Sequence, residues 1–193
     1  KYPCSGTITM SPNRERVCVE MDFWSDSFVI LKAATGSVLY ESNNDTCYFD
    51  KFINDDVIAI KERKEDRTTI IYLKSNHNLV DGVIKSSTIA ENSLACVIKQ
   101  DDNTFVSVVD IETGREMVNF PLPNRDYYDI YFSPCARYLV IPCRDFLSDL
   151  AKGLASVVSD IVFVDVKKRI TKMHNDASLS CIFLLTGIHP IAL

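Results

Sequence analysis

The chain has 193 residues, of which 47% are hydrophobic and 24% charged, and these values fit an ordinary globular protein with one substantial core. Its net charge of −5 argues against a general nucleic-acid surface, which needs a basic face to displace counterions. No apolar stretch reaches the roughly eighteen residues that span a bilayer. We therefore expect no nucleic acid and no membrane among its partners.

A strand-like segment that ends in a short turn recurs about every forty residues. The copies are Phe28–Gly36, Thr69–Asn76, Phe105–Gly114 and Ile161–Lys168. Their turns fall at positions 36, 77, 114 and 168, so the steps are about 41, 37 and 54 residues. A unit of roughly 40 to 45 residues with four short strands is typical of a β-propeller blade.

The predicted fold class is all-β, a β-propeller fragment of about four four-stranded blades plus the start of a fifth. The expected units cover residues of about 5–43, 44–86, 87–126, 127–175 and 176–193. Gly36 and Gly114 are expected to form tight turns, because glycine accepts positive φ without steric cost. Pro121 and Pro123 are expected to stop strand pairing after the third unit.

The long last step indicates an insertion in the fourth unit, from Arg144 to Asp160. Apolar residues recur at helical spacing within it, at Phe146, Leu147, Leu150, Leu154 and Val158. This spacing predicts a short amphipathic helix between the second and third strands of the unit. Removing about fourteen residues would return the step to about 40, which supports an insertion into an otherwise regular blade.

Two short motifs resemble WD40 repeats. Phe132–Leu139 reads F-S-P-C-A-R-Y-L and is similar to the family's F-S-P-D-G-R-Y-L turn, which contains Pro134. Val109–Gly114 resembles the W-D-x-x-T-G end of the third strand, with Val in place of Trp. His174 stands nine residues before Phe183, as the family's G-H histidine stands before its F-S-P phenylalanine.

The resemblance implies a divergent WD40-like propeller over nearly the whole chain, with His174 and Pro134 in structural roles. No WD dipeptide is intact and no Gly precedes His174, so the buried polar network of the family is expected to be largely missing. The weak repeats and the helical insertion look most like propellers of large scaffolds, including NACHT-and-WD-repeat proteins.

Seven cysteines are present, an odd number without a C-x-x-C pair, which fits neither a disulfide framework nor a zinc site. Cys18, Cys96 and Cys143 lie in strand-like runs, where free cysteine behaves as a small buried hydrophobe. This usage predicts a reducing, cytoplasmic location. A start without Met and an end within a strand pattern predict a fragment, with the rest of its propeller missing from this chain.

The sequence carries no G-x-S-x-G, H-E-x-x-H, phosphate-binding G-x-x-x-x-G-K-[ST] or G-x-G-x-x-G motif. We therefore expect no catalytic residue, no cofactor and no metal. The acidic pairs Asp55-Asp56 and Asp101-Asp102 are interpreted as turns, because a calcium loop needs more ligands at fixed spacing. His77, His174 and His189 are interpreted as turn or structural residues.

Aromatic residues and Arg are enriched at protein interfaces, which makes several residues candidates for protein binding. Trp24 lies in an acidic loop, Arg125 and Tyr127 lie on a connection between units, and Phe146 and Leu150 lie in the insertion. Trp24 fits an exposed anchor and a packed residue equally well. The tyrosine pair at 127–128 has a competing interpretation, in which its rings close the core between adjacent blades.

Two functions agree with these patterns. The first is a non-catalytic protein–protein interaction scaffold within a larger multidomain protein, whose partners are other proteins. The second is the propeller domain of a serine peptidase of the oligopeptidase type, since such propellers also carry S-P-D-G-x-x-L turns. In that case the propeller would gate substrate access, and catalysis would come from a domain outside this chain.

Overall fold

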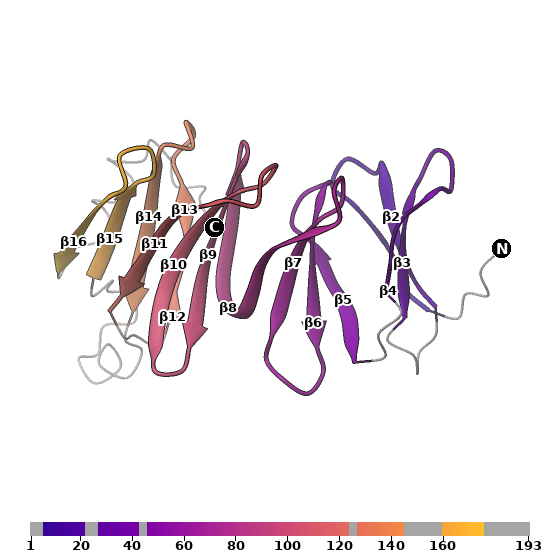
Figure 1. Ribbon diagram of the computed structural model, residues 1–193, viewed down its shortest axis with the longest axis horizontal. Helices are drawn as coiled ribbons and strands as arrows, with labels where there is room; N and C mark the ends of the chain where they lie inside the picture. Colours follow the sequence, from indigo (N-terminus) through magenta and orange to yellow (C-terminus); the bar gives the residue numbers. More distant parts are fainter. Residues whose placement is uncertain (1–5, 22–26, 43–45, 124–126, 145–159, 176–193) are drawn as a thin grey trace, which may run out of the picture. The chain divides into compact units, whose positions relative to one another are not determined.

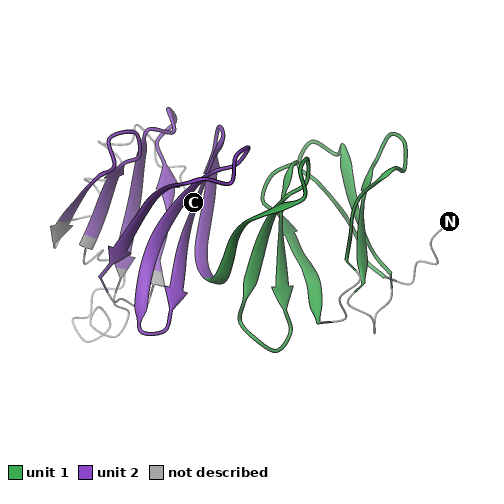
Figure 2. Cartoon of the chain, in the orientation of Figure 1, with its two compact units in different colours: residues 1–83 green, residues 84–193 purple. Residues whose placement is uncertain are grey.

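The computed structural model describes residues 6–21, 27–42, 46–123, 127–144 and 160–175 (Figure 1). These residues form antiparallel strands joined by turns, which confirms the predicted all-β class. The chain divides into two compact units, residues 1–83 and 84–193 (Figure 2). The apolar residues of the predicted helix, from Phe146 to Val158, and the predicted fifth unit at 176–193 lie outside the described residues.

The first sheet is a four-stranded meander in which each strand pairs with the next along the chain. Its strands are β1 (Ile8–Met10), β2 (Arg16–Glu20), β3 (Phe28–Lys32) and β4 (Val38–Ser42). Val, Ile and Phe dominate β3, the residue types that favour pleated, half-buried backbone. This order is that of one predicted blade.

The second sheet has seven strands, again in chain order. Its strands are β5 (Cys47–Phe52), β6 (Val57–Glu62), β7 (Thr68–Tyr72), β8 (His77–Ala90), β9 (Ser93–Gln100), β10 (Asn103–Asp110) and β11 (Glu116–Leu122). The long strand β8 crosses the boundary of the two units. Its first half, His77 to Gly82, pairs with β7, so β8 holds the end of one repeat and the start of the next.

The expectation that Pro121 stops pairing is wrong. Pro121 lies within β11 and stands opposite Phe105 in β10. Strand β11 is the last strand of its sheet, and proline is tolerated on such an edge because its missing N–H has no strand to bond.

The third sheet has five strands, and two short ones share one partner. Its strands are β12 (Tyr127–Tyr128), β13 (Tyr131–Phe132), β14 (Tyr138–Arg144), β15 (Asp160–Asp165) and β16 (Ile170–Asn175). The predicted first strand is thus split at Asp129–Ile130. Asp129 donates its N–H to the carbonyl of Pro142 at 3.2 Å, but proline has no N–H to return, so the ladder is interrupted there.

One backbone hydrogen bond recurs in all four repeats. The residue after the third strand donates its N–H to a carbonyl in the turn between the first and second strands. The pairs are Ala33 to Glu15 (2.8 Å), Leu73 to Asp56 (2.8 Å), Ile111 to Asn92 (2.9 Å) and Val166 to Arg137 (3.0 Å). The four repeats therefore share one backbone plan although their sequences differ.

In unit 1 a shared core lies between the first sheet and strands β5 to β7. The buried residues that form it are Cys18, Phe28, Ile30, Phe49, Ile58, Ile60, Ile71 and Leu73. Phe28 of the first sheet contacts the ring of Phe49 across this interface, with ring centroids 5.8 Å apart. Neighbouring sheets within this unit therefore cover each other's apolar faces.

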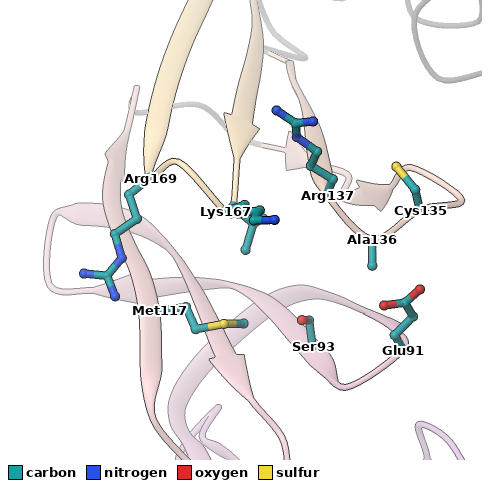
Figure 3. A pocket seen from close by; sticks show the side chains of 9 residues that line it. Glu91, Ser93, Met117, Cys135, Ala136, Arg137, Lys167 and Arg169 are labelled. Carbon is teal, nitrogen blue, oxygen red and sulfur yellow. The ribbon is translucent and has the colours of Figure 1, made fainter.

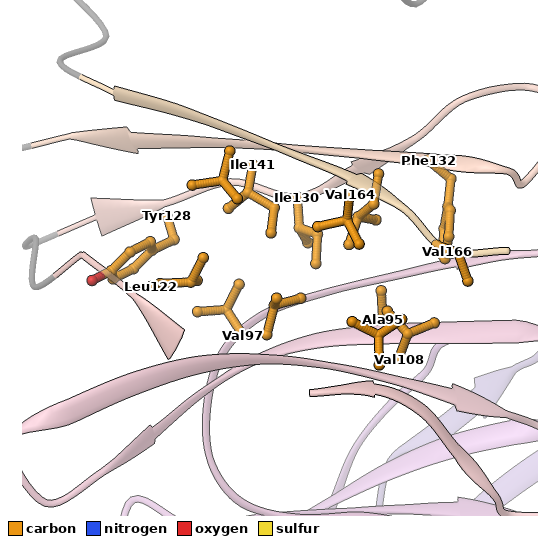
Figure 4. Packing of buried hydrophobic residues seen from close by; sticks show 14 of the residues in the cluster. Ala95, Val97, Val108, Leu122, Tyr128, Ile130, Phe132, Ile141, Val164 and Val166 are labelled. Atoms are coloured by element: carbon orange, nitrogen blue, oxygen red, sulfur yellow. The ribbon is translucent and has the colours of Figure 1, made fainter. Parts of the chain in front are cut away.

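Unit 2 repeats this arrangement between strands β9 to β11 and the third sheet (Figure 4). Strands β9 to β11 and the third sheet each contribute mostly Val, Leu and Ile. The fully or nearly fully buried members are Ala95, Val97, Val106, Val108, Val118, Leu122, Tyr128, Ile130, Phe132, Leu139, Ile141, Cys143, Val162, Val164 and Val166.

The inner strands are buried on both faces. Ala95 and Val97 of β9 belong to the core of unit 2, while Leu94 and Cys96 alternate with them and are also 0% exposed. A sheet with one wet face would show polar residues at every second position. Cys18, Cys96 and Cys143 are all buried, which confirms the predicted role as small hydrophobes, and burial raises the pKa of Cys96 to about 12.

Two Ser-Pro turns, at Ser11 and Ser133, have the same geometry. In each the buried serine hydroxyl accepts a backbone N–H from the following strand at 3.1 Å. The fourth residue of the turn, Arg14 or Ala136, has a positive φ of 63° or 50°. That position carries Gly in the WD40 turn that Phe132–Leu139 resembles, and the positive φ shows why Gly suits it.

The turns after the third strands use glycine in the same way. Gly36 has a φ of 69° and donates its N–H to the Lys32 carbonyl at 2.8 Å. Gly114 has a φ of 66° and donates to the Asp110 carbonyl at 2.9 Å. Both glycines therefore close the hairpin between the third and fourth strands of a repeat.

The shared core predicts a large difference between two isoleucines of the third sheet. We expect Ile141→Ala, at a fully buried position, to lower the free energy of unfolding by about 2–5 kcal/mol, because it leaves a cavity between two sheets. Ile170→Ala, at a position that is 49% exposed, should cost about 0.5 kcal/mol or less. Urea denaturation followed by circular dichroism measures both, and equal losses would contradict the described packing.

The positive φ of Ala136 makes a second prediction. Ala136→Gly should raise the free energy of unfolding by about 0.5–1 kcal/mol, because glycine reaches this conformation without the steric cost that alanine bears. Ala34→Gly is the matched control in an exposed turn where φ is not positive, and it should give no gain. The same urea titration measures both variants; a loss at Ala136 would contradict the turn geometry.

Candidate functional site

Four of the five predicted protein-binding residues, Trp24, Arg125, Phe146 and Leu150, lie outside the described residues. Tyr127 is the first residue of β12, and its backbone pairs with Arg144 of β14. The structure does not describe its side chain. These five sites stay predictions.

The neighbouring residue Tyr128 agrees with the interpretation in which the tyrosine rings close the core between sheets. It is 4% exposed and belongs to the core of unit 2, where its hydroxyl donates to the carbonyl of Pro123. Of the predicted structural residues, His174 lies in β16 with its backbone opposite Ile161, and Pro134 is exposed in the turn between β13 and β14.

The acidic pair at 55–56 contacts groups of the protein itself. Asp55 accepts the backbone N–H of Asn13 at 2.9 Å, and Asp56 forms ion pairs with Arg16 and with Lys74, the latter at 3.0 Å. These contacts link the turns of two neighbouring repeats within unit 1. Both carboxylates therefore stabilise turns here.

The aspartate of the V-D-I-E-T-G motif is also structural. Asp110 accepts the backbone N–H and the hydroxyl of Thr113 at 2.9 and 2.7 Å, and these bonds lower the pKa of its carboxyl. Its second oxygen accepts the side-chain amide of Asn92 at 2.9 Å. Asp110 therefore links the turn after β10 to the turn after β8, although no WD dipeptide is intact.

A pocket of about 630 Å³ opens at one end of unit 2 (Figure 3). Four segments far apart in sequence meet there: the turn after β8, strand β11, the turn after β13 and the turn after β15. The lining residues are Glu91, Ser93, Met117, Cys135, Ala136, Arg137, Val166, Lys167 and Arg169. Its volume lies in the range of sites that hold small ligands or short peptide segments.

Three of these turns reverse the chain through a non-glycine residue of positive φ. Glu91, Ala136 and Arg169 have φ values of 50°, 50° and 57°. A turn of this kind directs the next strand back into its sheet within two to four residues. The sheets therefore hold the lining side chains on short, well-defined turns.

The basic residues of the pocket differ in their partners. Arg137 forms an ion pair with Asp165 at 3.2 Å and lies over the ring of Tyr138, 4.9 Å from its centroid. Lys167 and Arg169 are exposed and, within the described ranges, neither forms an ion pair with a carboxylate. The pocket thus presents two cations that have no carboxylate partner among the described residues, on a chain whose net charge is −5.

Cys135 is the exposed thiol of this pocket. The Ser133 hydroxyl lies 3.3 Å from its sulfur, and this contact together with the backbone N–H of Arg137 lowers the pKa of the thiol. A lower pKa gives more thiolate at neutral pH, and the thiolate is the reactive form.

No pattern in the sequence pointed to this pocket as a site. Its residues span positions 91 to 169 and match no motif. Lysine and arginine residues in turns normally indicate a solvent-exposed surface and not a binding site. The one available signal was the F-S-P-C-A-R turn, which contains Cys135 and Arg137.

The sequence matches no family model and no curated protein. Among solved structures the chain is similar to Hsv2 of Kluyvelomyces marxianus, a β-propeller protein, with a TM-score of 0.51 at 6% sequence identity. The similarity covers 85% of this chain and 48% of that one. The fold is β-propeller-like.

At this identity the likeness concerns the fold of the propeller alone, and the chain spans about half the length of Hsv2. The four repeats with a shared backbone plan agree with it, because propeller blades are four-stranded antiparallel sheets. In the part of the propeller that the structure describes, no helix is long and apolar enough to cross a membrane.

The cysteine environments predict selective alkylation of the propeller. At pH 7 iodoacetamide should modify Cys135 well before Cys18, Cys96 and Cys143, because these three are buried and the pKa values of Cys18 and Cys96 are raised by desolvation. Peptide mass spectrometry assigns each site separately. Modification of Cys96 as fast as Cys135 in the folded protein would contradict the described burial.

Ser133→Ala tests the cause of the lowered pKa. Removing the hydroxyl should move the pKa of Cys135 back towards its ordinary value, so its alkylation rate at pH 7 should fall while the rate at high pH, where the thiol is ionised either way, changes little. Ser11→Ala removes the equivalent hydroxyl of the other Ser-Pro turn and should leave the Cys135 rate unchanged.

Proposed function

We propose that this chain is a non-catalytic protein–protein interaction module of a larger, cytoplasmic multidomain protein. The observation that carries the proposal is the pocket of unit 2, where turns of two packed sheets present cations, polar groups and apolar side chains to solvent. Loops on a rigid scaffold carry binding in such folds, because the scaffold fixes their positions while their sequences vary.

The composition of the pocket suits protein recognition. Met117 and Val166 offer apolar contact, and methionine adapts its shape to different partners. Lys167 and Arg169 add charges that steer a partner and set its orientation. The WD40-like motifs support an interaction role by analogy, since the residues that carry them build turns here.

Site-specific photo-crosslinking of the full-length protein tests the proposal. A benzophenone side chain at Glu112 or Lys168, two exposed turn positions of unit 2, should crosslink the same partner protein in cells. The same group at Lys172, exposed within strand β16, serves as the control and should not. If neither of the two turn positions crosslinks a partner protein, the result would contradict the proposal.

The peptidase alternative predicts a different result for the same full-length protein. A fluorophosphonate probe would label a serine outside this chain, and the protein would hydrolyse short peptides. Under the proposed function we expect neither labelling nor hydrolysis, and both together would replace the interaction role with substrate gating.

A further inference from the structure

We propose that the pocket of unit 2 binds an acidic peptide segment of a partner protein, with carboxylates at Lys167 and Arg169 and an apolar side chain against Met117 and Val166. This inference rests on the proposed function and adds the chemical class of the ligand.

The charges of the pocket favour an anion at one end. Lys167 and Arg169 sit on the turn between β15 and β16, and neither is neutralised by a carboxylate within the described residues. Arg137 is already paired with Asp165, so it contributes less to a ligand. In a chain of net charge −5, two cations without a carboxylate partner among the described residues form a local positive site that attracts acidic groups.

The size and lining of the pocket favour a short peptide. At about 630 Å³ it holds a few side chains, and its apolar lining is formed by Met117, Ala136 and Val166. An inorganic anion would leave the half-buried side chains of Met117 and Ala136 uncovered. A peptide that carries an apolar residue beside its acidic residues would cover them.

The opposite end of the pocket is acidic, and this sets the direction of the peptide. Glu91 lies with Cys135 and Ala136 on the side away from Arg169 (Figure 3). A carboxylate placed there would be repelled, whereas a basic residue would be attracted. A nucleic acid carries a negative charge at every nucleotide and would meet Glu91, so the polarity of the pocket favours a peptide over a nucleic acid.

The experiment uses the full-length protein and two synthetic peptides, one with the order Glu-Glu-Leu-Ser-Ser-Lys and one with the reversed charges, Lys-Lys-Leu-Ser-Ser-Glu. Cys135 reports occupancy, because it lines the pocket and is exposed. The first peptide should slow iodoacetamide labelling of Cys135 in a saturable manner and the second should not. Raising the salt concentration should weaken this protection, since the contacts are exposed ion pairs.

Matched variants test the named residues. Lys167→Glu with Arg169→Glu should weaken binding of the first peptide at least about tenfold. Lys99→Glu with Lys172→Glu makes the same change of charge at exposed strand positions, and it should leave binding unchanged. Glu91→Lys should tighten binding of an all-acidic peptide relative to the unaltered protein.

Three outcomes would overturn the inference: no protection by the first peptide at millimolar concentration, equal protection by both peptides, or stronger protection by a single-stranded oligonucleotide. If a partner still crosslinks to the turns of unit 2 while no peptide protects Cys135, the proposed function stands and only the acidic-peptide assignment fails.

Discussion

The structure depends on one constraint, that the apolar faces of consecutive sheets must cover each other. A four-stranded meander of this length has two faces and cannot bury either by itself. The inner strands β6, β9 and β15 carry apolar residues at successive positions, so they need cover on both sides. Within each unit one of these faces is covered by the neighbouring sheet, as in the contact of Phe28 with Phe49.

This packing also explains where function can reside. Once the sheets are held face to face, the hairpin turns that join their strands are brought together at the ends. The recurring bond from the third strand to the first turn, such as Val166 to Arg137, fixes one turn against another. The pocket of unit 2 is built from such turns, so its lining can vary without changing the core.

The architecture could be predicted because it depends on local patterns. Runs such as Val57–Ile60 and turns such as Thr113-Gly114 have strong backbone preferences, and their regular spacing revealed the repeat. The structure differs from the predicted strands at two prolines. Pro121 lies within an edge strand, and Pro142 interrupts the pairing of the strand opposite it, which is split into β12 and β13. The pocket could not be predicted, because Glu91, Met117 and Lys167 meet only through the packing of separate sheets.

The most direct test of this account is a set of isotope-edited nuclear Overhauser spectra on the core of unit 2. The account predicts cross-peaks between the methyl groups of Leu122 in β11 and the ring of Tyr128 in β12, and between Val108 in β10 and Val164 in β15, because these pairs belong to facing sheets of one core (Figure 4). Contacts of Leu122 and Val108 confined to their own sheet would contradict it.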